Sequence, residues 1–289
     1  MRSRLPTIVF VAAVAAALCA CSSGRTVAAR SARAAVRPTP TGAGHRGTTK
    51  PAAPAGTPTA HHFGGSPPVG ALFPPGLSVH VCTASVVDSR SGDLLLTAAH
   101  CIVGTGKGYV FAPGYHDGIE PYGTWTVTAA YGAPAWISRQ APAADYAFLV
   151  VAPHLRDGHP EPIEDATGAY RIGAAPRPGT RVTVPAYVIG SHDDPITCTA
   201  PTYDHSDTPA FNCNLYADGT SGAPWLERAG HSWEVVGVIG GLHQGGCYPW
   251  TSYTAPFGAA TQRLAARAAS GQAASTFPTP GGDGCPNGS

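Results

Sequence analysis

The sequence predicts an all-β domain that spans residues 67–270 and ends in one helix. Two observations predict this class. Short runs rich in β-branched and aromatic residues recur along this stretch, and turns containing Gly, Pro or Asp separate them. The composition agrees, with 36 Gly, 29 Pro and a single Met in 289 residues, because such a chain favours many short strands over long helices.

Eight short β-rich runs are the predicted strands. They lie at 77–89, 94–99, 109–112, 124–131, 146–152, 181–190, 210–216 and 233–241. A helix is predicted at 258–270, where GAATQRLAARAAS is rich in Ala and places Leu264 on one side. Two packed antiparallel barrels suit this number of strands, and a sandwich is the alternative that the pattern leaves open.

The two ends of the chain differ from this domain. Residues 1–21 are typical of a secretory signal, since two arginines precede an apolar run that is too short to span a membrane. Residues 22–66 contain Ala, Arg, Thr, Pro and Gly in no periodic order, so we expect a disordered basic linker. Residues 271–289 are rich in Gly, Pro and Ser, so we expect a flexible tail.

The end of the signal offers two interpretations. Leu18-Cys19-Ala20-Cys21 resembles the lipobox of bacterial lipoproteins, in which the signal is removed before a cysteine that becomes lipid-modified. That resemblance implies lipidation of Cys21 and membrane association through the lipid. Ordinary signal cleavage nearby is the alternative. Either way we expect an extracellular or cell-surface protein.

Charge is divided unevenly along the chain. Eight basic residues and no acidic residue precede Asp88, which leaves ten basic and seventeen acidic residues behind, a net charge of −7. A nucleic-acid enzyme usually carries basic charge on its folded body, so we expect no nucleic-acid partner. No C-x-x-C or H-E-x-x-H motif occurs, so we expect no metal and no other cofactor.

Export also bears on the six cysteines that follow the signal. Outside the cytosol an even set is typical of disulfides, and six cysteines allow fifteen pairings. Spacing along the chain favours Cys82–Cys101 and Cys198–Cys213.

The segment YADGTSGAPW contains a candidate nucleophile, Ser221, with Gly219 two places before it and Gly222 directly after. A serine hydroxyl is a weak nucleophile that needs a base and a third group to orient the base. His100 ends an apolar run and Asp145 opens another, so the chain contains both. Taken singly, these are a turn serine, a core-edge histidine and a strand-start aspartate; together they favour catalysis.

Three segments resemble the chymotrypsin/trypsin-like serine proteases, in the bacterial secreted branch. LTAAHC at 96–101 resembles the catalytic-histidine segment, AADYAFLVV at 143–151 the aspartate strand, and GTSGAPW at 219–225 the G-x-S-G-x-P nucleophile loop. The order His, Asp, Ser fits this family and differs from the orders in α/β-hydrolases and subtilisins. The resemblance implies a fold of two packed antiparallel six-stranded β-barrels and the activity of a serine endopeptidase.

The resemblance also implies a role for each site residue. Ser221 would attack the substrate carbonyl, His100 would accept and return its proton, and Asp145 would orient the imidazole. The backbone N–H groups of Gly219 and Ser221 would form the oxyanion hole. The pair Cys82–Cys101 would fix the histidine loop.

A fourth segment, VVGVIGGLHQGG at 235–246, resembles the strand that lines the substrate pocket. It implies that Gly240 and Gly241 border the pocket and that Leu215, six residues before the serine, forms its floor. Trypsin-like members have Asp at that position, so cleavage after Arg or Lys is not supported. His243 could contribute to recognition, although a solvated loop histidine is the interpretation we favour.

Two departures from the family affect the disulfides and the activation. The family often bridges the nucleophile loop to the pocket strand, but Cys213 suits Cys198 here, which leaves Cys247 for Cys285 or for no partner. Animal digestive members place an Asp directly before the nucleophile to bind a newly cut amino terminus. Thr220 stands at that position, so we expect activity without such a cut.

The implied partners are protein or peptide substrates, and we expect a monomer. A catalytically silent homologue that binds peptides or proteins in the same cleft is one alternative. An esterase on the same fold is the other.

Overall fold

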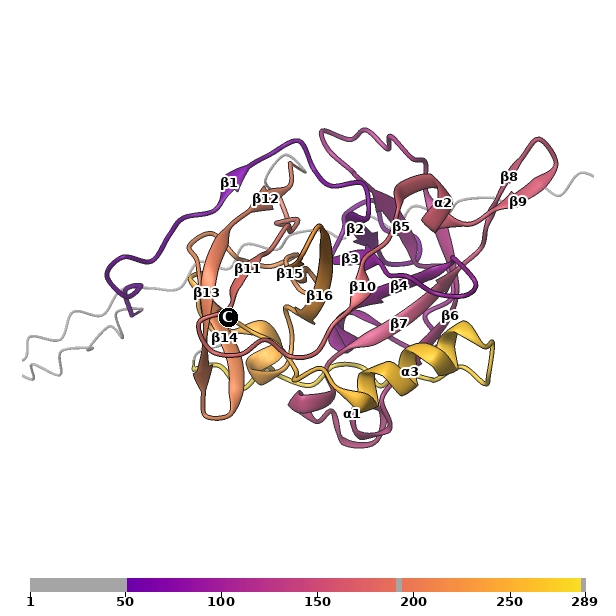
Figure 1. Cartoon of the computed structure of the whole chain (residues 1–289). Coiled ribbons are helices and arrows are strands. Elements are labelled where there is room, and N and C mark those ends of the chain that lie inside the picture. Colours follow the sequence, from indigo (N-terminus) through magenta and orange to yellow (C-terminus); the bar gives the residue numbers. More distant parts are fainter. Residues whose placement is uncertain (1–50, 191–193, 287–289) are drawn as a thin grey trace, which may run out of the picture. The chain divides into compact units, whose positions relative to one another are not determined.

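A computed structural model describes residues 51–190 and 194–286, which lie in one compact unit, Pro51–Ser289. Strands dominate this part of the chain (Figure 1). The predicted all-β class is confirmed, with a closed six-stranded antiparallel barrel and a C-terminal helix. Among the described residues, every helix is too short or too polar to cross a bilayer.

The first half of the domain is the closed barrel. Its strands pair in the order β2-β3-β4-β7-β6-β5, and every pair is antiparallel. Closure leaves no open edge that could pair with another chain. The strands are β2 (Val69–Phe73), β3 (Cys82–Val86), β4 (Leu94–Thr97), β5 (Val110–Pro113), β6 (Trp125–Gly132) and β7 (Ala147–Val151).

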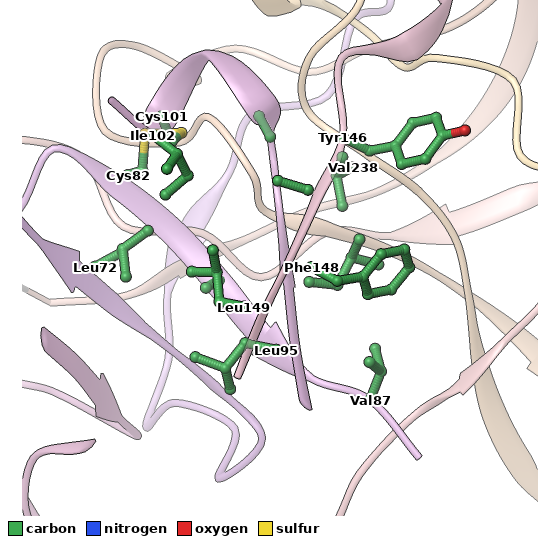
Figure 2. Close-up of a cluster of buried hydrophobic side chains, with 14 of the residues drawn as sticks. Leu72, Cys82, Val87, Leu95, Cys101, Ile102, Tyr146, Phe148, Leu149 and Val238 are labelled. Atoms are coloured by element: carbon green, nitrogen blue, oxygen red, sulfur yellow. A yellow bond between two sulfur atoms is a disulfide. The ribbon is translucent and has the colours of Figure 1, made fainter. Parts of the chain in front are cut away.

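The core of the barrel is aliphatic and aromatic. Figure 2 shows Leu95 of β4 beside Leu149 and Phe148 of β7, and all three side chains are fully buried. Burial of each such side chain contributes about 1.5–3 kcal/mol. Val238, from the second half of the domain, joins the same cluster (Figure 2). The first half is therefore packed against the second through shared core residues.

The second half is a seven-stranded sheet. Its order is β10-β16-β15-β11-β13-β14-β17; β10 and β16 are parallel and the other pairs are antiparallel. The resemblance implied a second six-stranded barrel, and this sheet occupies its place without closing on itself. The strands are β10 (Arg171–Ile172), β11 (Arg181–Thr183), β13 (Thr199–His205), β14 (Thr208–Asn212), β15 (Pro224–Ala229), β16 (Ser232–Val238) and β17 (Thr251–Tyr253).

Helices and small sheets complete the domain. The predicted C-terminal helix is α3 (Ala259–Ala269), which buries Leu264 and Ala268 and packs on β6 and β7 (Figure 1). The remaining elements are α1 (Pro134–Arg139), α2 (Ile163–Thr167), the 3-10 turns η1 (Ala99–Cys101), η2 (Pro142–Ala144) and η3 (Leu242–Gly245), and the strands β1 (His61–His62), β8 (His154–Arg156), β9 (His159–Glu161) and β12 (Ile196–Thr197).

Three disulfides close loops of the domain. The structure contains the two pairs that spacing favoured, Cys82–Cys101 and Cys198–Cys213, and pairs Cys247 with Cys285, which is one of the two possibilities left open for Cys247. The first joins β3 to η1. The third joins the segment after η3 to the C-terminal tail. Closing loops of this size contributes about 3 kcal/mol each in the chain-entropy estimate.

The linker was predicted to run to residue 66, and the structure corrects that boundary. Residues from Pro51 onward lie on the second half: β1 pairs with β12, and Thr59 forms a bridge with Asn214. The Asn214 side-chain amide also donates to the carbonyl of Pro58. Backbone pairing at a sheet edge needs no apolar periodicity, so the composition of this segment did not reveal it.

The tail was predicted to be flexible, and the structure instead places residues 271–286 against the domain. Phe277 is 3% exposed, and its N–H and carbonyl exchange hydrogen bonds with those of Gly104. The buried Phe277, the disulfide at Cys285 and hydrogen bonds to the domain together hold a segment that is otherwise Gly- and Pro-rich. The predicted signal, residues 1–21 with Cys21, lies outside the described residues.

Candidate active site

His100 lies on η1, directly after the end of strand β4. The Cys82–Cys101 bond ties this turn to β3. The backbone N–H of His100 donates to Oδ1 of Asp145 at 2.9 Å, and the imidazole Nδ1 donates to Oδ2 of the same carboxylate at 2.7 Å. The backbone and the side chain of His100 therefore bind the same carboxylate, which fixes the position and the rotation of the imidazole ring.

Asp145 reaches His100 because β4 and β7 are antiparallel neighbours. The pair Thr97↔Ala147 ends the β4–β7 ladder, so the residues after β4 and before β7 share one edge of the barrel. The Asp145 side chain is fully buried. A buried carboxylate costs several kcal/mol unless hydrogen bonds compensate. The two N–H groups of His100 and the N–H of Gly241, at 2.8 Å from Oδ2, provide that compensation.

This pairing also sets the tautomer of His100. An ionised carboxylate only accepts hydrogen bonds, so the imidazole proton stays on Nδ1. The other nitrogen, Nε2, then carries a lone pair in the neutral ring. The geometry therefore leaves His100 with a basic nitrogen directed away from Asp145.

Ser221 lies in the loop that leads into β15 and is held between the two halves. Its carbonyl accepts from Thr83 N in β3 at 2.8 Å, and Gly222 N donates to the carbonyl of Ile239 at 2.7 Å. Gly222 has a φ of +81°, and a Cβ there would lie 2.2 Å from Thr83 O. Only glycine allows the loop to pack this closely on the strand ends that precede His100.

The orientation of two peptides beside Ser221 is fixed by their carbonyls. Asp218 O accepts from Ile189 N at 2.8 Å, and Thr220 O accepts from Ala223 N at 3.0 Å. In a trans peptide the N–H points opposite to the carbonyl. The N–H groups of Gly219 and Ser221 are thus turned away from these partners, and neither donates to an acceptor within the described part of the chain. Two oriented donors are suited to stabilise a developing oxyanion.

Two buried threonines support this loop, and the sequence did not single them out. Thr83 Oγ1 donates to the carbonyl of Gly219 at 3.0 Å and accepts from Tyr187 N at 3.0 Å. Thr97 Oγ1 donates to Thr83 O at 2.8 Å. Both side chains are fully buried. Their only sequence signal is a polar residue inside an apolar strand, which does not distinguish them from other strand threonines.

The predicted pocket residues occupy two different places. Gly240 and Gly241 lie against Asp145, since a Cβ on Gly240 would be 2.9 Å from the carbonyl of Asp145. Leu215 stands in a turn with a φ of +80°, and the residue is 53% exposed. Its role as the pocket floor stays a prediction. The side chain of His243 donates from Nδ1 to the carbonyl of Asp283 at 2.9 Å, so it contacts the tail.

Within the described residues, two groups of side chains lie close enough together to bind a metal ion, but the cysteines of both groups form disulfides. A disulfide sulfur is not the thiolate that binds a metal ion. Each group contains both members of one disulfide and one histidine. The groups are Cys82, His100 and Cys101, and His243, Cys247 and Cys285.

Comparison with known proteins gives the fold. No protein-family model and no curated protein matches the chain. Among solved structures, the protease Anisep from Arthrobacter nicotinovorans is 24% identical, with a TM-score of 0.63 over 73% of this chain and 100% of that one. The thermostable serine protease AL20 from an extremophilic microorganism is 23% identical, with a TM-score of 0.61 over 72% and 99%.

A third solved structure is a Glu endopeptidase, 17% identical, with a TM-score of 0.55 over 74% of this chain and 98% of that one. The chain thus spans nearly the whole length of all three proteases. At these identities the likeness establishes the fold, which is the chymotrypsin-like fold that the sequence resemblance implied.

Proposed function

We propose that this chain is an exported serine endopeptidase that hydrolyses peptide bonds through His100, Asp145 and Ser221. The observation that carries the proposal is the hydrogen-bonded pair of His100 and the buried Asp145. This pair leaves a basic nitrogen at the strand end against which the Ser221 loop packs. A buried carboxylate such as that of Asp145 costs free energy, and such groups are typical of sites where a proton is transferred.

In this mechanism Ser221 Oγ attacks the substrate carbonyl while Nε2 of His100 accepts the hydroxyl proton. Asp145 stabilises the imidazolium, and the N–H groups of Gly219 and Ser221 bind the oxyanion. The imidazolium then donates its proton to the leaving amine, which breaks the peptide bond and leaves an acyl-enzyme on Ser221. Water, activated by the same nitrogen, hydrolyses the ester and restores the serine.

Labelling with a fluorophosphonate probe tests the proposal. The wild-type chain should be labelled on Ser221, and Ser221→Ala should abolish both labelling and peptide hydrolysis, a loss of about 10⁶-fold in kcat. The matched control is Ser138→Ala, because Ser138 lies exposed on α1 and removing its hydroxyl should change neither readout. A wild-type chain that binds peptides without labelling would instead indicate the catalytically silent homologue.

Comparing substrates distinguishes the second alternative. An endopeptidase turns over internal peptide bonds, whereas an esterase hydrolyses only the matching esters. Cleavage of a peptide library, read by mass spectrometry, would support the peptidase and reveal the residue accepted beside Leu215. Turnover confined to esters would contradict it.

We also propose that the protein acts at the cell surface or outside the cell, and that Cys21 carries a lipid. The signal-like residues 1–21 and the six paired cysteines support this proposal. Cys21→Ala should release the protein from the membrane fraction and remove an acyl mass. A wild-type protein recovered entirely in the medium, without acyl mass, would contradict lipidation and indicate secretion after ordinary signal cleavage.

A further inference from the structure

The C-terminal segment Phe277–Cys285, which we call the strap, is attached to the domain at both of its ends. At one end Phe277 is buried and exchanges two hydrogen bonds with Gly104, four residues after His100. At the other end Cys285 is bonded to Cys247. The residues between the two anchors are mostly exposed. The middle of the strap therefore stays in place through hydrogen bonds with the domain.

Three residues provide most of those hydrogen bonds, and all three have left-handed backbones. Gln140, His243 and Gln244 have φ values of 50°, 53° and 50°. Non-glycine residues adopt this conformation at a cost that the surroundings must offset. Each of the three directs its side chain to the strap: Gln140 to Thr279 O, His243 to Asp283 O and Gln244 to Gly281 O.

Gly281 joins two separate parts of the domain through a single residue. Its N–H donates to Oε1 of Gln140 at 2.7 Å, and its carbonyl accepts from Nε2 of Gln244 at 2.7 Å. Gln140 ends α1, just before η2, and Gln244 lies in η3. The strap thus links the end of α1 to η3, although more than one hundred residues of sequence separate them.

Both of these parts hold Asp145. On one side, Gln140 is followed by η2, which ends where Asp145 begins. On the other side, Gln244 N donates to the carbonyl of Gly241 at 3.0 Å, and Gly241 N donates to Oδ2 of Asp145 at 2.8 Å. A shift of either segment would change the hydrogen bonds that orient the carboxylate, and with it the ring of His100.

We propose that the strap positions the catalytic acid, with Gln140 and Gln244 as positioning residues that act through Asp145. The inference rests on the proposed function, because it concerns the same site. It gives a role to a tail whose composition indicated none. Neither glutamine touches the candidate nucleophile, so their effect passes through the backbone that surrounds the carboxylate.

The experiment compares Gln140→Ala with Gln262→Ala in the full chain. Each variant loses a side-chain amide that donates to a backbone carbonyl, but Gln262 lies on α3 and binds Ile172 O, away from the strap. Gln140→Ala should lower kcat about tenfold with KM nearly unchanged, since misplacing a catalytic group costs rate rather than binding. The acid limb of its pH–rate profile should move to lower pH, because a displaced carboxylate stabilises the imidazolium less. Gln262→Ala should match the wild type in both readouts.

Gln244→Ala is the second variant and answers the question if Gln140→Ala does not fold. It removes the other hydrogen bond of Gly281 and should lower kcat in the same way. Gln140→Glu, which keeps the acceptor for Gly281 N, should recover part of the lost rate. The inference would be overturned if Gln140→Ala and Gln244→Ala had the same kcat and the same pH–rate profile as the wild type and the control Gln262→Ala. A wild type that a fluorophosphonate fails to label would instead refute the proposed function.

Discussion

Thr83 illustrates how one hydroxyl can organise a site without touching substrate. It is fully buried in β3, and its Oγ1 links Gly219 of the candidate oxyanion loop to Tyr187 in the second half. Burial raises the pKa of the Tyr187 phenol far above its usual range, so this neighbour stays neutral. The hydroxyl of Thr83 therefore ties the peptide of Gly219 to the backbone of Tyr187.

Thr83→Val tests this role, because valine keeps the shape and removes the hydroxyl. The carbonyl of Gly219 and the N–H of Tyr187 would both lose their partner, and each unpaired buried group costs about 1–3 kcal/mol. We expect a lower free energy of unfolding and about a tenfold lower kcat, since the Gly219 peptide is no longer held. Urea denaturation and steady-state kinetics measure the two effects.

Thr128→Val is the matched control for this substitution. Thr128 is exposed on β6, where its hydroxyl donates to Val150 O on the surface of the barrel. Its removal should change stability by a few tenths of a kcal/mol at most and leave kcat unchanged. A Thr83→Val chain that behaves like this control would show that the hydroxyl does not support the loop.

At the scale of elements, the barrel contains a second carboxyl group, that of Asp93, which has fewer hydrogen bonds to stabilise its charge than Asp145 has. Asp93 directly precedes β4, and burial raises its pKa. The N–H of Ile163 in α2 lowers this pKa by a smaller amount, and the nearby negative charge of Asp165 raises it further. Its Oδ1 has no hydrogen-bond partner among the described residues. The negative charge of an ionised Asp93 at the start of β4 therefore lowers the stability of the folded state.

This environment predicts a pH-dependent stability. A folded-state pKa above the unfolded one means that the native chain binds the proton more tightly. The free energy of unfolding should therefore fall as the pH rises from 3.8, the ordinary pKa of aspartate, through the raised folded-state value. Asp93→Asn should remove this part of the pH dependence in urea titrations across that range.

The control for this experiment is Asp157→Asn in the exposed turn between β8 and β9. Its backbone has a φ of 52°, a conformation that asparagine also tolerates. The control should follow the wild-type pH profile. A wild type and an Asp93→Asn variant with parallel profiles would contradict the interpretation of Asp93 as a half-buried acid whose Oδ1 has no hydrogen-bond partner among the described residues.

At the scale of the whole molecule, the described start of the chain is already built into the fold. Val69 is 1% exposed inside β2, and residues before it pair with the second half through β1. Thr220, which directly precedes Ser221, donates from Oγ1 to Ala217 O at 2.8 Å. A newly cut amino terminus near Val69 would find no carboxylate at this position.

We therefore predict that the domain becomes active without a cut near Val69. Residues 22–289, expressed with every peptide bond intact, should titrate with an active-site reagent as soon as the disulfides have formed. Intact mass verifies that the chain is uncleaved. A chain that gains activity only after a defined cut upstream of Cys82 would contradict the prediction.

The sequence by itself determined the class, the C-terminal helix and the candidate residues, because these depend on local patterns. Alternating turns and apolar runs set the strands, and LTAAHC, AADYAFLVV and GTSGAPW marked His100, Asp145 and Ser221. Each of these motifs is a short continuous segment, so it can be identified without knowledge of the fold. The spacing of the cysteines also favoured two of the three bonds that the structure contains, Cys82–Cys101 and Cys198–Cys213, and left the pairing of Cys247 open.

Only the tertiary structure decided which groups support the site. Thr83, Gly241 and Gln140 act through hydrogen bonds to residues far away in sequence, and no local pattern announces such a partner. The same reason explains why the linker boundary and the flexibility of the tail were predicted wrongly. Residues 51–66 and 271–286 lack apolar periodicity, yet they are held by backbone pairing, one buried Phe and one disulfide, which exist only once the rest of the domain has folded.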